Sequence, residues 1–487
     1  MASVLVKATE SFRSNQLVVW VAVGAAAILL GLQLFVPPII GLADNGDFDK
    51  VMGYAGFQHV ADSYEDKYFS WAVTKFAIVR PFWYRSGYFT SETLLAFLAR
   101  YAAVPFASGH VFDIRVLGAL HIVLLLTAIG LLVASGRDLS HAAQAALAVL
   151  LVFVFTDVGY AALFNSFYSQ TASLLFLLLT IGVAAAAIRR GRLEGGLMLA
   201  YFVCAFLFVG SKPQETIQAP FLAAFAVFLA RGAGPWWRRP AVWLSLLLCL
   251  FAAWYNLRTP ASFRQLALYD TVFLELLPHS PDRAADLREL GLDPELAKDS
   301  GRNPYVAESP LRDPGFRELF FPHFGYGDLI RFYLAHPSRL FSVVRRGADQ
   351  ALRLRPPALG NFEKMQELPA HTMTRHFAVW SDLRLKLRPL ALPFLTLLLA
   401  GNLLFALLGY RRSSELGRLL RAGIVLLVLV ASAEFLVCVL ADSLIGADRH
   451  LFVFQALCDL VLIADLTWVA QSIASRWRAK PARVEAA

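Results

Sequence analysis

Three aspartates crowd one short stretch near the start of the chain. Asp44, Asp47 and Asp49 fall within the string LADNGDFDK, and the Asn45-Gly46 dipeptide between the first two is typical of a tight turn. Such a turn could project Asp44 and Asp47 toward one point, and paired carboxylates suit general-base catalysis or a divalent metal. An ordinary acidic loop, or aspartates that charge the N-terminus of a helix, would account for the same residues.

Three further strings carry polar groups that could bind a ligand. Their candidate residues are Asn165, Tyr168 and Gln170 of NSFYSQ, Lys212 and Gln214 of GSKPQE, and Arg449 and His450 of DRH. A lysine at membrane depth suits an anionic headgroup, and an arginine suits bidentate contact with phosphate. Helix capping, a snorkelling lysine in a turn and a surface ion pair are the structural alternatives. An aromatic-rich stretch, Tyr64 to Tyr88, could stack on sugars or form an interfacial belt.

The elements that must position these residues are membrane helices. Apolar residues make up 57% of the 487-residue chain, charged residues only 17%, and the mean hydropathy is +0.55. This composition excludes disordered, collagen-like and disulfide-scaffold classes and nearly excludes a soluble enzyme, because the apolar residues fall in long blocks. The blocks predict ten spanning helices, the third, fifth and sixth of them short, at 17–36, 112–134, 142–156, 170–188, 196–210, 218–231, 241–257, 389–409, 422–441 and 450–470.

The basic residues orient these helices. With the N-terminus inside, the inner segments hold 17 Lys and Arg, whereas the short outer loops hold only Lys212 and Arg449. This bias places both termini in the cytoplasm and explains the formal charge of +9 without a nucleic-acid partner. The candidate residues then all fall on the outer face, so the sequence predicts an outer-face site with carboxylates from one loop and cations from others.

The chain is therefore predicted to be an all-α polytopic membrane protein with about ten transmembrane helices. Its predicted parts are an N-terminal membrane module (1–257, with a first outer loop at 37–111), a large outer segment (258–388), and C-terminal helices with a short basic tail (389–487). The outer segments carry two amphipathic stretches suited to the membrane interface, Thr90–Val104 and Asp328–Arg346, the second broken at His336-Pro337. The Pro- and charge-rich stretch 278–316 is predicted to be a surface loop.

This arrangement resembles the GT-C superfamily of integral-membrane glycosyltransferases. The resemblance covers nearly the whole chain in architecture: an aspartate just after the first span (Asp44), a long first outer loop, a basic residue at a later outer turn (Lys212), and a final outer arginine (Arg449). More narrowly, the strings DNGDF, NSFYSQ, GSKPQ and DRHLF resemble bacterial glycan-biosynthesis hexose transferases of the WsfD type.

The resemblance implies transfer of a hexose from a polyprenyl-phosphate donor to a glycan or lipid-linked acceptor, with inversion. Asp44 would be the general base, and Asp47 would orient Asp44 or the acceptor. Many members carry adjacent acidic residues, whereas Asn45 follows Asp44 here, so which of Asp44 and Asp47 is the base stays open. A Mg²⁺ or Mn²⁺ ion on the two carboxylates is also open, since salt bridges to the cations of the site would equally satisfy them.

The same resemblance assigns the remaining candidates and the location. The donor phosphate would be bound by Lys212, Arg449 and His450. Substrate would be contacted by Asn45, Asn165, Tyr168, Gln170 and Gln214. The protein would lie in the bacterial inner membrane, in contact with membrane lipid, with its site on the periplasmic side.

Two other functional classes compete with the enzyme. Glu434, Asp459 and Asp465 lie inside predicted spans, where acids often mark proton relays or ion sites, so the alternative is a transporter or flippase of a lipid-linked or anionic substrate. A buried polar contact in the bundle, for example to His121, would explain these acids too, and the sequence shows no inverted repeat. A non-catalytic scaffold of a surface-polymer machine is the third class.

Overall fold

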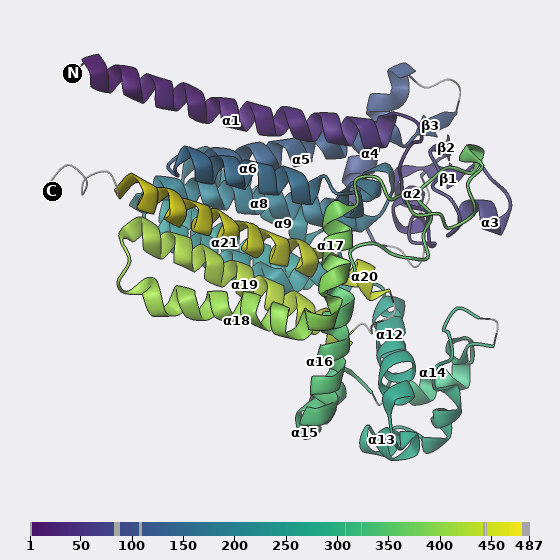
Figure 1. The fold of residues 1–487 in the computed structure, drawn as a ribbon. Helices are drawn as coiled ribbons and strands as arrows, with labels where there is room; N and C mark the ends of the chain where they lie inside the picture. The colour runs from purple at the N-terminus through teal and green to yellow at the C-terminus, as the bar shows by residue number, and fades with distance from the viewer. Residues whose placement is uncertain are drawn as a thin grey trace.

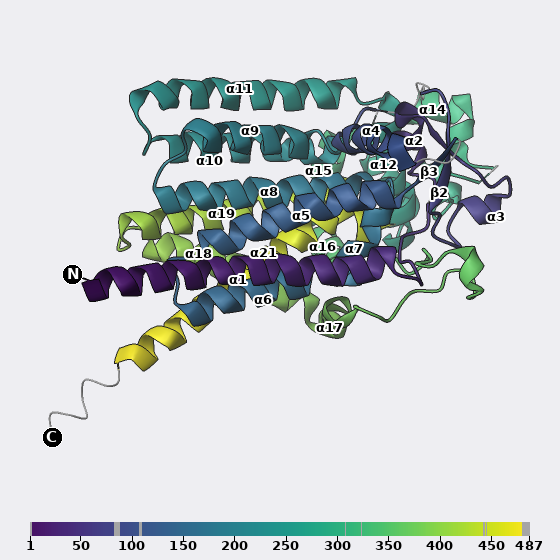
Figure 2. The same cartoon turned by 90° about the horizontal axis from the view of Figure 1, so that it is seen from above.

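The chain folds into a bundle of long helices with an irregular region at one end (Figure 1). The computed structural model describes residues 2–81, 88–106, 110–306, 308–322, 324–441, 444 and 446–479. The start of the first helix and the end of the last one lie together at the end opposite the irregular region (Figures 1 and 2). Both predicted outer segments therefore lie at one end of the bundle. Of the aromatic stretch, Trp83, Tyr84 and Arg85 lie outside the described residues.

Helices form at all ten predicted spans. They are α1 (Ala2–Phe35), α5 (Arg115–Ser135), α6 (His141–Phe155), α8 (Ser169–Arg190), α9 (Gly195–Val209), α10 (Ala219–Ala230), α11 (Pro235–Arg258), α18 (Ala391–Tyr410), α19 (Glu415–Ala441) and α21 (Phe452–Ala479). In the described part of the chain, seven helices are each long and apolar enough to cross a membrane, and α6 with the segment Val158–Asn165, bent by 53°, makes an eighth. The chain is thus an all-α polytopic membrane protein.

Short turns connect the spans at the outer end. They are α7 (Val158–Ala161), η2 (Ala162–Asn165), η3 (Pro213–Gln218) and α20 (Ala447–His450). The two short spans that flank η3, α9 and α10, have 15 and 12 residues. Because η3 ends where α10 begins, this polar turn is held at the mouth of the bundle.

Burial separates the protein-facing helices from the lipid-facing ones. Helix α8 packs between α5 and α9 and is buried along most of its length, including the polar residues Thr171 and Ser173. Helix α11 forms an edge of the bundle (Figure 2), and its Trp236 and Trp243 are 89% and 68% exposed. Apolar side chains exposed to that extent need lipid around them, so α11 belongs to the lipid-facing layer.

The first outer segment holds a small sheet that the sequence analysis did not predict. Strands β1 (Phe57–His59), β2 (Lys75–Ile78) and β3 (Val111–Asp113) pair antiparallel in that order, beside the short helices α2 (Asp49–Ala55) and α3 (Tyr64–Lys67). Phe57, Phe76 and Phe112 are fully buried and pack on Phe167, which lies just before α8. Strands of three or four residues are too short to leave a clear alternation of apolar and polar residues.

The predicted interfacial helix at Thr90–Val104 forms as α4 (Ser91–Ala103), but its first turn packs into protein. Thr90 caps the helix, its hydroxyl accepting a backbone N–H three residues on at 3.2 Å. Glu92 is fully buried, and its carboxylate lies 3.0 Å from His121 Nε2 of α5. The outward face carries apolar residues such as Tyr101, which is 69% exposed.

The second outer segment is more helical than predicted. It holds α12 (Ala261–Tyr269) and the π-helical turn η4 (Asp270–Leu276), then α13 (Arg283–Glu289), α14 (Pro314–Phe320), α15 (Tyr326–Ala335), α16 (Pro337–Ala351) and α17 (Val379–Leu387), with 3₁₀ turns η5 (Leu277–His279), η6 (Pro294–Asp299), η7 (Pro310–Arg312), η8 (Lys364–Gln366) and η9 (Arg388–Leu390). The surface-loop prediction for 278–316 is wrong where Asp282 and Asp313 cap α13 and α14. The predicted break at His336-Pro337 is confirmed.

A buried ion pair ties the second outer segment to the last span. Asp459 of α21 pairs with Arg384 of α17, and both side chains are almost fully buried. The same carboxylate accepts hydrogen bonds from Tyr160 Oη at 2.7 Å and from Trp380 Nε1 at 2.9 Å. Asp459 is therefore satisfied by three side chains of the protein, those of Arg384, Tyr160 and Trp380, rather than left open to a transported ion.

The other two acids inside the spans also have protein partners. Asp465 accepts a hydrogen bond from Asn402 Nδ2 of α18 at 2.8 Å. Glu434 of α19 accepts one from Gln218 Nε2 at 2.8 Å. Polar contacts of the kind expected for buried acids are thus present, but His121 is not among them because it binds Glu92 of α4.

Removing Arg384 should destabilise the protein far more than removing a partly exposed arginine of the same segment. The change Arg384→Ala strands the buried carboxylate of Asp459, which costs about 3–5 kcal/mol. The matched control is Arg388→Ala, whose pair with Asp349 is 30% and 38% exposed and should contribute less than about 1 kcal/mol. The unfolding midpoints of the purified variants in detergent test this, and equal shifts for the two would contradict it.

Candidate functional site

Asp44 lies at the centre of a tight turn that follows the first span. Its carboxylate is fully buried: Oδ1 accepts the backbone N–H groups of Gly46 (2.7 Å) and Phe48 (3.1 Å), and Oδ2 lies 3.0 Å from His59 Nε2. The predicted turn at Asn45-Gly46 is present, with Gly46 at a φ of +96° that favours glycine. Burial raises the pKa of Asp44, because it outweighs the hydrogen bonds from His59 and the backbone.

Asp47 has an entirely separate set of partners. Its Oδ1 accepts from Lys50 Nζ and its Oδ2 from Arg449 Nη1, both at 2.6 Å. Arg449 lies 402 residues further along, so this pair joins the first outer loop to the last outer turn. Burial alone would raise the pKa of Asp47, but the charges of Lys50 and Arg449 outweigh it and hold this pKa well below its ordinary range. The Asp47 side chain is 30% exposed.

Tyr168 and Asn165 fasten the acidic turn to the start of α8. The buried Tyr168 hydroxyl donates to Ala43 O at 2.8 Å and accepts from Asn45 N at 3.0 Å. Asn165 Nδ2 donates to Leu34 O at the end of the first span (3.0 Å) and to Ile40 O in the segment that follows it (2.9 Å). These polar groups hold the turn in place, and the predicted contact of Asn45, Asn165 and Tyr168 with substrate stays a prediction.

The second outer segment is hydrogen-bonded along the acidic turn. Gly41 N donates to Asn361 O and Ala43 N to Gly360 O, both at 2.9 Å, and Asn361 Nδ2 returns a bond to Gly41 O at 2.9 Å. A Cβ on Gly360 would meet Ser70 O at 2.1 Å, so only glycine allows this close approach. The backbone of the turn is therefore held from both sides, by α8 and by residues 360–361.

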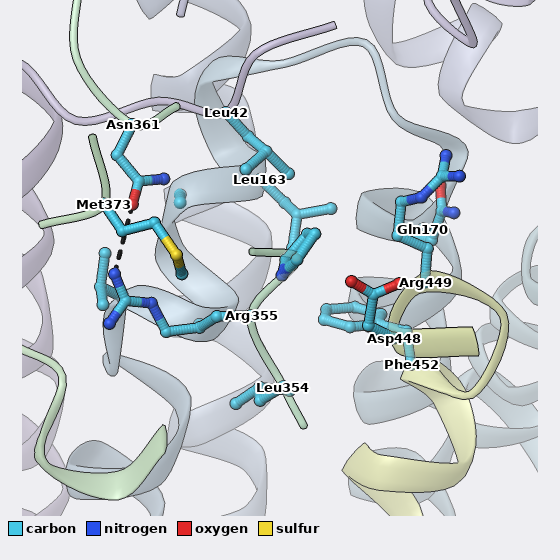
Figure 3. Close-up of a pocket in the computed structure, with 14 residues that line it drawn as sticks. Leu42, Leu163, Gln170, Leu354, Arg355, Asn361, Met373, Asp448, Arg449 and Phe452 are labelled. Atoms are coloured by element: carbon cyan, nitrogen blue, oxygen red, sulfur yellow. Dashed lines mark hydrogen bonds between the residues drawn. The ribbon is translucent and has the colours of Figure 1, made fainter. Parts of the chain in front are cut away.

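A pocket lies between the two outer segments and the outer ends of α8 and α21 (Figure 3). It holds about 400 Å³ of empty space, part of it open solvent. Its polar lining comes from Gln170, Arg355, Asn361, Asp448 and Arg449, and its apolar lining includes Leu42, Leu163, Leu354 and Phe452. Figure 3 shows Arg355 and Asn361 on one side, with Asp448 and Arg449 across from them. Arginines on two sides of a partly apolar pocket suit an amphipathic anion.

Lys212 and Gln214 reach the same turn of chain that carries Arg449. Gln214 Nε2 donates to His450 O at 3.1 Å, which ties η3 to α20. Lys212 Nζ lies 3.5 Å from Gln214 Oε1, and among the described residues no carboxylate oxygen lies within 4.0 Å of this ammonium. The structure thus brings Lys212, Gln214, Arg449 and His450 to one corner of the outer face, with the ammonium of Lys212 not neutralised by direct contact.

The described residues do not fit a divalent ion at the acidic turn. Asp44 uses both oxygens on the backbone and His59, and Asp47 uses both on Lys50 and Arg449. Across the described ranges, no group of three or more His, Cys, Asp or Glu side chains could hold a metal ion. The sequence left salt bridges as the alternative to a bound metal ion, and Asp47 forms two of them, with Lys50 and Arg449.

Three side chains of this region left no recognisable signal in the sequence. His59 lies 15 residues after Asp44 and reaches it only because β1 folds back beside the turn. Arg355 and Asn361 lie in an irregular stretch, and Arg355 donates to Asn361 Oδ1 at 3.3 Å (Figure 3). Only the tertiary pairing of two distant outer segments makes these residues part of one site.

The chain belongs to the family described as the YfdI N-terminal transmembrane domain, whose model matches residues 6–485. This match covers nearly the whole chain and agrees with a multi-pass membrane protein. No curated protein and no solved structure matches the chain.

The Asp47–Arg449 pair should show a measurable coupling that depends on pH. In a double-mutant cycle of Asp47→Asn and Arg449→Gln, we expect a coupling of about 1 kcal/mol at neutral pH, as for a partly exposed pair. Because the pKa of Asp47 is lowered on folding, this stabilisation is present above its ordinary pKa of about 4 and is lost as the pH falls below it.

Unfolding midpoints of the four proteins in detergent, followed from pH 7 down to about pH 3, measure this coupling. Asp49→Asn is the matched control, because Asp49 lies on the same segment and forms no ion pair within 4.0 Å among the described residues. A coupling energy of zero at neutral pH, or one that grows as the pH falls, would contradict an ion pair between Asp47 and Arg449.

Proposed function

We propose that the protein is a glycosyltransferase that moves a hexose from a polyprenyl-phosphate donor to a glycan or lipid-linked acceptor at the outer face of the bacterial inner membrane. The observation that carries the proposal is the Asp47–Arg449 pair, which sets a carboxylate and a cation beside a pocket that Arg449 lines. Transfer of a sugar from a phosphate needs both groups: a base for the attacking hydroxyl and a cation for the leaving phosphate.

Arg449 is the group best placed to take the donor phosphate. Its guanidinium meets Asp47 at 2.6 Å and also lines the pocket, so a phosphate bound there would compete with Asp47 for the same cation. Arg355 on the other side of the pocket and the nearby Lys212 would add positive charge. The apolar lining, including Leu163 and Phe452 beside the outer ends of the spans, would accommodate the first part of the polyprenyl chain.

We place the general base at Asp47 and not at Asp44. Asp44 is fully enclosed and its oxygens hold the turn together, whereas the Asp47 side chain is 30% exposed. While Arg449 is bound to Asp47, the low pKa of this carboxylate makes it a poor base. Once Arg449 turns to the donor phosphate, Asp47 loses one of the two charges that lower its pKa and becomes a better one.

The reaction then proceeds in one displacement. Asp47 accepts the proton of the acceptor hydroxyl as the oxygen attacks the anomeric carbon. The bond from that carbon to the phosphate oxygen breaks, and polyprenyl phosphate leaves with the electron pair and its second negative charge, which Arg449 stabilises. Attack from the face opposite the leaving group inverts the anomeric centre.

The transporter alternative has less support. Glu434, Asp459 and Asp465 all bind neighbouring side chains of the described structure, as expected for buried structural acids. The scaffold alternative makes a different prediction for Asp47. A scaffold could keep its function without an ionised carboxylate at this position, whereas the enzyme needs one for turnover.

The direct test is donor turnover by the purified protein in nanodiscs. Wild type should release free polyprenyl phosphate from at least one member of a panel of polyprenyl-phosphate hexoses. Asp47→Asn should lower the rate by about 10²–10⁴-fold, the usual contribution of a general base, without changing the unfolding midpoint by more than a few degrees. Asp49→Asn, a neighbouring carboxylate outside the proposed site, should keep the rate within a few-fold of wild type.

Asp44→Asn separates the two aspartates. We expect it to lower the unfolding midpoint, because an amide replaces a carboxylate acceptor of two backbone N–H groups. If Asp47→Asn retains full turnover while a stably folded Asp44→Asn loses it, the base is Asp44. If no donor in the panel is consumed or bound, the enzyme proposal fails.

A further inference from the structure

A second polar cluster lies buried at the mouth of the bundle, where η3 packs against α19. Glu215 and Gln218 come from η3 and Glu434 from α19, and all three side chains are fully buried. Glu434 is well satisfied, because it accepts hydrogen bonds from Gln214 and Gln218. None of these groups lines the pocket beside Arg449.

Three oxygen atoms of this cluster make no hydrogen bond of ordinary distance and angle to a donor among the described residues, although the Ser173 hydroxyl lies close enough to Glu215 to lower its pKa. They are both carboxylate oxygens of Glu215 and Oε1 of Gln218. Because η3 is a 3₁₀ helix, side chains three residues apart lie one above the other, so Glu215 and Gln218 project from the same face. The Gln218 amide nitrogen is bound to Glu434 at 2.8 Å, and its buried oxygen is not used in that bond. A buried acceptor without a donor is destabilising, so the three oxygens call for a hydrogen-bond donor or a positive group.

The charges around the cluster point the same way. The titratable and polar side chains around it are Lys212 from the same turn, Glu434 and Cys438 from α19, and Ser173 from α8. The Ser173 hydroxyl also lies 2.7 Å from that of Ser211, and the backbone carbonyl of His450 accepts from Cys438. Two carboxylates thus face one lysine ammonium, a formal excess of one negative charge. Burial, and then the charge of Glu434, raises the pKa of Glu215 well above its ordinary range.

We propose that Glu215, Gln218 and Glu434 form a binding site for one small monovalent cation, either a proton or Na⁺. If Glu215 is protonated, its O–H group could donate a hydrogen bond to Gln218 Oε1. Two of the three oxygens would then have a hydrogen-bond partner. Na⁺, a hard cation that prefers oxygen ligands, would contact all three. Either occupant removes the excess negative charge and leaves the ammonium of Lys212 available to an anion. This site does not depend on the proposed glycosyl transfer.

The test uses the full chain in nanodiscs, with wild type, Glu215→Gln and Asp465→Asn as a control that removes a partnered acid elsewhere in the bundle. The first readout is the unfolding midpoint when NaCl replaces choline chloride at constant ionic strength. The second is the infrared carbonyl band of a protonated carboxylic acid at neutral pH. If Na⁺ is the occupant, it should raise the midpoint of wild type and of Asp465→Asn by roughly 2 °C or more, and leave Glu215→Gln unchanged.

If a proton is the occupant, the midpoint should not respond to Na⁺, and a carboxylic-acid band present in wild type and Asp465→Asn should be missing from Glu215→Gln. Should Glu215→Gln fail to fold, Gln218→Leu keeps the carboxyl group but removes one acceptor oxygen. It should weaken the Na⁺ effect or shift the acid band to higher wavenumber. No response to Na⁺ together with no acid band that depends on Glu215 or Gln218 would overturn the proposal.

Discussion

The outer face of this protein depends on how the short turn after the first span satisfies its own backbone. A chain that leaves a membrane helix and turns back over the bundle exposes N–H and C=O groups that need partners. Here Asp44 accepts two of the N–H groups, Tyr168 binds the backbone of Ala43 and Asn45, and residues 360–361 bind that of Gly41 and Ala43. The position of Asp47, and with it the pairing to Arg449, follows from this arrangement.

Asp44 and Asp47 look alike in the sequence, but they differ in burial and therefore in their partners. Asp44 is enclosed, so its charge is used on backbone N–H groups and on His59, whereas Asp47 is partly open and meets Lys50 and Arg449. The opposite pKa shifts reflect the balance between burial and partners. Burial outweighs the effect of His59 and the backbone at Asp44, whereas Lys50 and Arg449 outweigh burial at Asp47. The sequence motif shows that both residues are acidic, but it does not show which of them is buried.

Most of the spans were predictable because they are long apolar blocks, whereas the short ones, such as α9 and α10, were predictable because the placement of Lys and Arg requires a helix there. The strings around Asp47, Gln170 and Arg449 were predictable as polar breaks on one face. The sheet and His59 were not, since the strands have only three or four residues. Arg355 and Asn361 were not, because they join the site only through the contact of Asn361 with Gly41, 320 residues away. Helices α13 and α14 were missed because prolines and charges fill that stretch, while capping by Asp282 and Asp313 decides the local structure.

Gln214 connects the two polar regions of the outer face. Its amide nitrogen binds both the carboxylate of Glu434 and the carbonyl of His450, the residue after Arg449. Together with Cys438 Sγ at 3.1 Å, three acceptors share this one NH₂ group, so a change in the charge of the Glu215–Glu434 cluster would alter how strongly Gln214 holds the backbone of α20. The cluster is thus joined to α20 by the side chains of Gln214 and Cys438, and a change of charge in the cluster would act on the turn that carries Arg449. If the cluster takes up one positive charge, as proposed above, its two carboxylates would compete less strongly for Lys212, whose ammonium could then meet an anion.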